Sequence, residues 1–154
     1  MAGIVGLTEL QHTNGTSAAT INTSGVISQP TKPLFRVCPA GDKAISNNST
    51  TVIPFDDKSS STELFDVGGY FNTSTFRYTP LVAGYYSVHM SVLLESANYT
   101  IGAINKNGVQ AFTNRAWSEG GVFSTAQISG VIHMNGSTDY VDIGIFQTIS
   151  VFNI

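Results

Sequence analysis

The sequence predicts an all-β protein made of antiparallel strands, and three observations lead to this prediction. Long stretches in the second half of the chain alternate apolar and polar residues, which is the period of a strand with one buried face. Asn-Gly pairs at 107–108 and 135–136 follow two of these stretches, and such pairs favour tight turns because both residues tolerate positive φ. No stretch shows the roughly 3.6-residue period of an amphipathic helix.

The first strand candidates in chain order are short. Residues 35–38, 51–55 and 76–79 are rich in aromatic and β-branched residues, and turn-forming residues bound each of them. Between the second and the third candidate, Gly68 and Gly69 allow the backbone to turn tightly ahead of an aromatic pair.

The later candidates are longer. Residues 84–94 and 98–105 precede the first Asn-Gly pair, and residues 122–134 and 140–146 lie on either side of the second. The apolar positions that are expected to face the core are Tyr86, Val88, Met90, Val92, Leu94, Ile128, Ile132, Met134, Val141, Ile143 and Ile145. Short strands followed by long ones favour two packed sheets over an up-and-down barrel, so we expect an antiparallel β-sandwich of the jelly-roll type.

We divide the chain into this sandwich, residues 34–154, and an extended N-terminal arm, residues 1–33. Residues 1–30 contain no aromatic residue, no Lys or Arg, and Glu9 as their only acid. Such a segment cannot bury enough apolar surface to fold alone, but it can add extended strands to a partner with free backbone edges. The alternative is a tail without a partner.

Composition excludes several classes of partner. Charged residues make up 11% of the chain, and the formal net charge is -3. Because there is no basic patch to neutralise phosphates, we exclude nucleic acid. No stretch approaches the roughly 18 apolar residues of a membrane-spanning helix, so we expect no membrane partner. The N-terminus lacks the basic start of a signal peptide, so we expect synthesis in a host cytoplasm.

Residues 51–92 resemble the signature region of complement C1q-type domains, in which an acid or amide, two aromatic residues, a glycine and a further aromatic recur at fixed spacing. The positions that carry the resemblance are Asp66, Phe71, Tyr78, Gly84 and Tyr86. Val88 and Met90 depart from the family, which prefers aromatic residues there. The resemblance covers roughly residues 34–146 and implies that these signature residues belong to the core of a C1q/tumour-necrosis-factor-like jelly roll.

Members of this family assemble as homotrimers, so the resemblance implies a homotrimer here. It also implies that residues 149–154 form the last strand, or that this strand is completed between subunits. The Thr- and Ser-rich N-terminal segment followed by such a domain is similar to the layout of structural proteins of tailed bacteriophages.

This resemblance implies a viral structural protein on the exterior of a virion. We expect a trimeric capsid decoration (cement) protein or a head fibre, whose residues 1–33 bind the major capsid protein or another virion protein while the knob faces outward. The alternative is a tail-fibre or receptor-binding tip for host attachment, which recognises a host surface glycan or protein.

No motif indicates a catalytic nucleophile, a phosphate loop or a zinc protease, so we expect no enzymatic activity and no cofactor. Some C1q-like trimers hold calcium, and Asp56, Asp57 and Asp66 are the candidate oxygen donors here; the alternative is solvated loop acids. His89 and His133 lie on the polar side of predicted strands, where ordinary hydrogen-bonded histidines are more common than metal ligands.

Three further residues are candidates for recognition or assembly. Arg115 and Trp117 are expected on a long loop between strands, and such residues commonly anchor recognition; alternatively, Trp117 plugs one end of the sandwich. Cys38 is the only cysteine, which excludes an intrachain disulfide. Its thiol is either a small buried group or a bridge between subunits.

Overall fold

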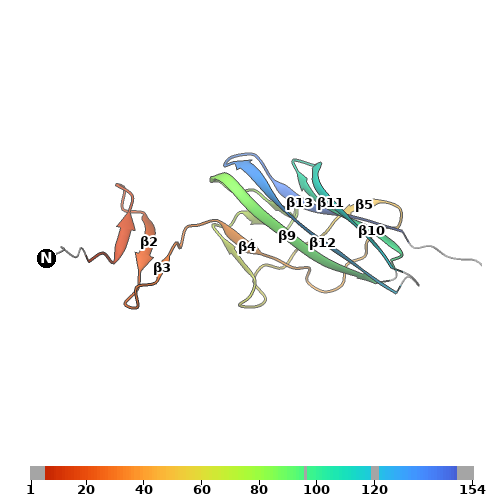
Figure 1. Ribbon diagram of the computed structural model, residues 1–154, viewed down its shortest axis with the longest axis horizontal. Coiled ribbons are helices and arrows are strands. Elements are labelled where there is room, and N and C mark those ends of the chain that lie inside the picture. The colour runs from red at the N-terminus through yellow and green to blue at the C-terminus, as the bar shows by residue number, and fades with distance from the viewer. Residues whose placement is uncertain (1–5, 96, 119–121, 149–154) are drawn as a thin grey trace, which may run out of the picture.

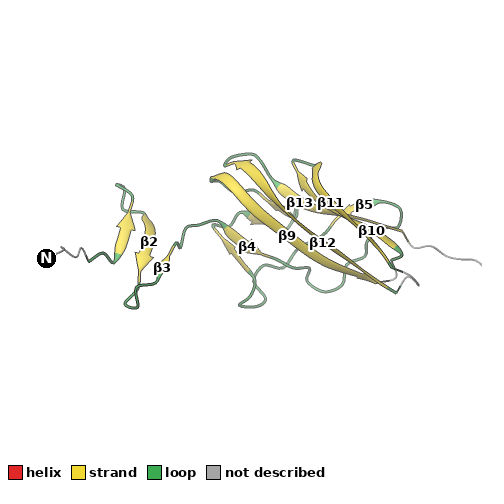
Figure 2. Cartoon of the chain, viewed as in Figure 1, coloured by secondary structure: helices red, strands yellow, loops and turns green. Residues whose placement is uncertain are grey.

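The computed structural model describes residues 6–95, 97–118 and 122–148, which form strands and connecting loops without a helix (Figures 1 and 2). The prediction of an all-β fold is confirmed for these residues, and so is the antiparallel pairing of the named strands. Residues 149–154, expected as a last strand, lie outside the described residues. The part of the chain that the structure describes contains no helix able to span a membrane.

The largest sheet has six strands, and β10 (Tyr99–Lys106) and β13 (Val141–Thr148) pair in its middle. Its strands in spatial order are β11 (Val109–Trp117), β10, β13, β8 (Arg77–Tyr78) and β7 (Phe71–Asn72), with β5 (Thr50–Val52) also paired to β13. The Asn107-Gly108 pair joins β10 to β11 with φ values of 53° and 78°, as its sequence predicts for a tight hairpin.

A second layer is formed by β9 (Ala83–Glu95) and β12 (Phe123–Asn135), which pair along their whole length. Their inward side chains pack against β10, where Gly102 makes the close approach possible. A Cβ at Gly102 would lie 2.3 Å from the terminal methyl of Met90 and 3.1 Å from the Cβ of Ala126. The main core cluster contains residues of both layers, an arrangement consistent with a β-sandwich.

A shorter pair, β4 (Leu34–Arg36) and β6 (Phe65–Val67), forms a separate two-stranded sheet. Phe35 of β4 stacks on Tyr78 of the large sheet, with 4.0 Å between ring centroids. This contact fixes the short pair against the rest of the core.

Residues 6–28 form a three-stranded sheet of β1 (Glu9–Gln11), β2 (Ser17–Ile21) and β3 (Ile27–Ser28) instead of the extended arm expected from the sequence. In Figure 1 this sheet lies at one end of the molecule, beyond β4. Gly15 and Gly25 have φ values of 84° and 77° in its two turns, which lets the strands fold back on one another.

The long strands match the sequence expectations closely, but two details differ. β11 was not expected, because it is an edge strand with mostly exposed residues and so lacks an apolar alternation. The Asn135-Gly136 pair does not close a hairpin, since β12 and β13 lie in different sheets. Instead, the Asn135 side-chain oxygen accepts hydrogen bonds from the N–H groups of Ser137, Thr138 and Asp139 and shapes the connecting loop.

Candidate functional site

Two signature residues, Phe71 and Tyr78, belong to the buried core, and a third, Asp66, is hydrogen-bonded to the backbone of Phe71. Asp66 is the centre of a hydrogen-bond network: its carboxylate accepts the N–H groups of Tyr70 and Phe71, both at 3.0 Å, and the Lys58 ammonium at 2.8 Å. Its side chain is only 4% exposed. The network holds the turn after β6 in place, which is a role in folding and leaves no free carboxylate oxygen facing solvent.

The signature aromatic residues pack against one another. Phe71 and Tyr78 are buried, and the ring of Tyr86 lies edge-on to Tyr78 at 6.2 Å. Burial raises the pKa of Tyr78. Tyr86 donates its hydroxyl to the Val82 carbonyl at 2.7 Å, and Gly84 lies between these two residues at the start of β9.

The other candidate calcium ligands are engaged by their own neighbours. Asp56 accepts the Ala40 N–H and the Lys43 ammonium, both at 2.7 Å, and these bonds lower its pKa. Asp57 caps a turn by accepting bonds from Ser60 and from the Ser59 N–H, which lower its pKa as well. Among the residues described, no three His, Cys, Asp or Glu side chains gather into a group that could hold a metal.

The outward face of β9 and β12 carries no Asp, Glu, Lys or Arg between the ends of the two strands. Between the ends of the two strands, its outward positions are Ala83, Tyr85, Ser87, His89, Ser91, Leu93, Thr125, Gln127, Ser129, Val131, His133 and Asn135. Tyr85 is 80% exposed, and Leu93 and Val131 are 61% and 60% exposed. Solvent-facing sheets usually carry polar side chains, so exposed apolar side chains on such a face are typical of a contact surface.

The two histidines of this face do not meet within one subunit. His89 lies opposite Ser129, whereas His133 lies opposite Tyr85, four positions further along the pair and therefore roughly 13 Å away. The ring of His133 instead contacts the ring of Tyr85, with 5.1 Å between centroids.

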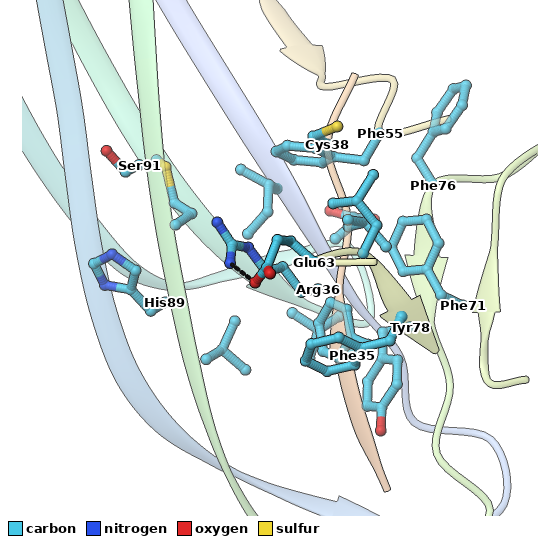
Figure 3. A pocket seen from close by; sticks show the side chains of 18 of the residues that line it. Phe35, Arg36, Cys38, Phe55, Glu63, Phe71, Phe76, Tyr78, His89 and Ser91 are labelled. Carbon is cyan, nitrogen blue, oxygen red and sulfur yellow. Dashed lines mark ion pairs between the residues drawn. The ribbon is translucent and has the colours of Figure 1, made fainter. Parts of the chain in front are cut away.

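A groove with a cavity volume of about 820 Å³ runs between β4 and β9. Among the described strands, β9 pairs with β12 alone and β4 with β6 alone, so each has an edge without a strand partner toward the groove. Figure 3 shows Phe35, Phe71 and Tyr78 at one side of the groove and His89 and Ser91 of β9 at the other. Two such edges above an apolar floor are able to accept an added strand.

Cys38 and one ion pair also belong to this groove. Arg36 and Glu63 pair at 3.7 Å between largely exposed side chains, shown by the dashed line in Figure 3. Cys38 is a half-buried free thiol on the groove wall, and its backbone forms a bridge to Asp57.

Arg115 and Trp117 lie on β11 and not on a loop, which corrects the sequence expectation. Trp117 is 77% exposed and therefore does not plug the end of the sandwich. It lies opposite Tyr99 of β10, with ring centroids 4.5 Å apart, and Tyr99 in turn meets Phe146 of β13 at 6.4 Å. The contribution of Tyr99 and Phe146 was missed, because only the strand register brings them to Trp117.

The described chain is thus an all-β protein of antiparallel sheets, arranged consistently with a β-sandwich, with a partly apolar outward face, an edge-lined groove and an exposed aromatic cluster. No model of a protein family matches its sequence, and no curated protein matches it.

Proposed function

We propose that this chain is a non-enzymatic structural protein of a bacteriophage virion, a C1q/tumour-necrosis-factor-like jelly roll that forms a homotrimer and decorates the capsid exterior. The observation that carries the proposal is the outward face of β9 and β12. It combines exposed apolar side chains with polar ones and has no Asp, Glu, Lys or Arg between the strand ends. This composition suits an interface core, from which charged residues are depleted.

A ring of three copies is the assembly that the signature resemblance favours. Such a ring is built from one repeated contact that closes after three subunits. The groove between β4 and β9 supports the further expectation that a strand is added to this layer, from residues 149–154 or from a neighbouring subunit, because it offers an edge on each side.

The N-terminal sheet is the proposed anchor to the major capsid protein or another virion protein. Its three short strands bury very little: Leu10 and Ile27 are 49% and 65% exposed. A sheet this small is at best marginally stable alone in water and gains stability from a partner. Within the described residues, β1 and β3 each pair with β2 alone, which leaves one edge of each strand for pairing with a shell protein.

The second candidate function is host attachment as a tail-fibre or receptor-binding tip. The exposed Trp117 and its neighbour Arg115 favour this candidate, because exposed aromatic and Arg side chains are typical anchors of recognition. The two functions place the affinity for the partner in different parts of the chain, the N-terminal sheet for decoration and the sandwich surface for attachment.

Gold labelling of purified virions with an antibody against residues 34–148 tests the proposal. Label spread over the head is the expected result. Label confined to the tail would contradict decoration and support the second candidate. As a follow-up, Ile27→Asp should reduce the amount of protein on the head, whereas Val109→Asp, a similarly exposed position on the β10–β11 hairpin, should not.

A further inference from the structure

The geometry points to a carbohydrate-binding site on the outer face of the β11–β10–β13 sheet, specific for a sugar that carries a carboxylate. This inference deepens the second candidate function, since it names the class of glycan that the sandwich surface would recognise, and it does not require capsid decoration. Three observations support it: an exposed aromatic cluster, a hollow beside it, and a cation without an acidic partner among the described residues. The proposed trimer contact, on the opposite face, would leave this site open.

The aromatic cluster is built by strand register. Tyr99 is the central residue, opposite Trp117 on one side and close to Phe146 on the other, so that rings from three strands are adjacent. Trp117 presents most of its surface to solvent. An aromatic ring has a negative face that attracts the positively polarised C–H groups of a pyranose, and exposed Trp and Tyr rings therefore suit the apolar side of a sugar.

A shallow hollow of about 130 Å³ lies next to these rings. It exists because Ala103 and Gly144, which face each other across β10 and β13, have almost no side chain. Ile101 and Phe146 line it with Gln110, which supplies amide hydrogen-bonding groups. Its volume is roughly that of four water molecules in the liquid, enough for a substituent of a sugar ring.

Arg115 supplies the charge. It lies opposite Ile101 on the same face and is exposed. The ion pairs within the described residues are formed by other Lys and Arg side chains. The Arg115 guanidinium therefore has no acidic partner among the described residues. A guanidinium binds a carboxylate through two parallel hydrogen bonds, and this complementarity selects an acidic sugar over a neutral one.

The site stays open in the proposed assembly. The β10 strand packs its inner face against Met90 and Ala126 of the β9–β12 layer, so the aromatic cluster and the proposed trimer contact lie on opposite outer faces of the sandwich. A trimer formed through β9 and β12 therefore leaves the aromatic face directed outward.

Trp117 is the only tryptophan of the chain, so its fluorescence reports directly on the site. The full chain is titrated with oligogalacturonate, sialyl-oligosaccharide and hyaluronan oligosaccharides as acidic probes, and with maltohexaose as a neutral one. The expected result is a saturable change in Trp117 emission with at least one acidic probe, weakened by salt and at least tenfold weaker with maltohexaose.

Two variants locate the binding. Arg115→Gln should weaken binding of the acidic probe roughly tenfold or more, because the neutral amide cannot replace the charge-assisted hydrogen bonds of the guanidinium. Tyr99→Ala should weaken it further, and its folding is checked by circular dichroism. The matched control is Arg36→Gln, another exposed arginine, which lies at the groove. No saturable signal with any acidic probe would overturn the proposal, as would binding unchanged in Arg115→Gln or equal affinity for maltohexaose. None of these results depends on the location of the protein in the virion.

Discussion

The ring of Phe35 lies almost parallel to the ring of Tyr78, with centroids 4.0 Å apart and planes inclined by 19°. Phe35 belongs to the β4–β6 pair and Tyr78 to the large sheet, so this stacked contact joins two sheets that share no strand pairing. Tyr78 is 2% exposed, and its hydroxyl has no hydrogen-bond partner within the described part of the chain. Tyr78 therefore stabilises the fold through the packing of its ring and not through its hydroxyl.

Truncation of Tyr78 is expected to be far more costly than removal of its hydroxyl. Tyr78→Ala should lower the free energy of unfolding by about 3–5 kcal/mol, because it leaves a cavity between the sheets. Tyr78→Phe should change it by about 1 kcal/mol or less, since the lost hydroxyl was buried without a partner. Urea unfolding followed by circular dichroism measures both variants, and a similar large loss in Tyr78→Phe would contradict this account.

Asp66 should be essential to the turn between β6 and β7. Its carboxylate accepts two backbone N–H groups and the Lys58 ammonium while almost fully buried. Asp66→Ala should cost about 2–3 kcal/mol of unfolding free energy, because it leaves these donors without an acceptor. Asp42→Ala, at an exposed loop position, is the control and should cost less than about 0.5 kcal/mol. Equal effects in the two variants would disprove the structural role of Asp66.

The loop between β12 and β13 should be sensitive to acid through Asp139. Hydrogen bonds from Lys106 and Asn107 and from the Asn135 N–H lower the pKa of Asp139 to about 2. In the unfolded chain an aspartate has a pKa of about 3.9, so the unfolded state binds more protons between these values and stability rises with pH there. The stabilisation by Asp139 is complete above about pH 4 to 5 and is lost as the pH falls through about 2.

The direction of this pH dependence can be tested by comparing the unmodified chain with a variant that lacks the Asp139 charge. At pH 7 the unmodified chain should have a higher melting temperature than Asp139→Asn, and the gap should close as the pH approaches 2. A gap that stays constant from pH 7 to pH 2 would show that the Asp139 charge does not stabilise the loop.

Assembly should depend on the outward face of β9 and β12. Val131 lies near the middle of β12, opposite Ser87, and is 60% exposed in the single chain. Val131→Asp should dissociate the trimer while leaving the fold intact, because each contact would then bury a charge. Val109→Asp places the same charge at a 71% exposed position on the other layer and should leave the trimer whole. Sedimentation velocity separates the two cases, and an intact Val131→Asp trimer would place the contact elsewhere.

The sequence predicts those parts of this fold that depend on local patterns. The alternation from Tyr86 to Leu94 gives β9 and its buried face, and the Asn107-Gly108 pair gives the hairpin that follows β10. β11 escaped detection because its core contact is made mainly by Phe112, which packs over Gly130 of β12. A single inward aromatic residue does not produce an alternating pattern.

The candidate sites were less accessible to sequence reasoning, because they depend on strand register between distant segments. Residue type alone singles out Arg115 and Trp117, but it places them on a loop and not on β11. Their neighbours Tyr99 and Phe146 come from β10 and β13, and nothing local links them. The groove likewise requires that β4 and β9 lie beside each other without a strand between them, which no sequence motif indicates.

Sedimentation equilibrium of the purified full chain at micromolar concentration tests the central claim most directly. The account predicts a single species with three times the 16.4 kDa mass of the chain. A monomer at these concentrations would contradict it, since the outward face of β9 and β12 would then remain exposed to solvent.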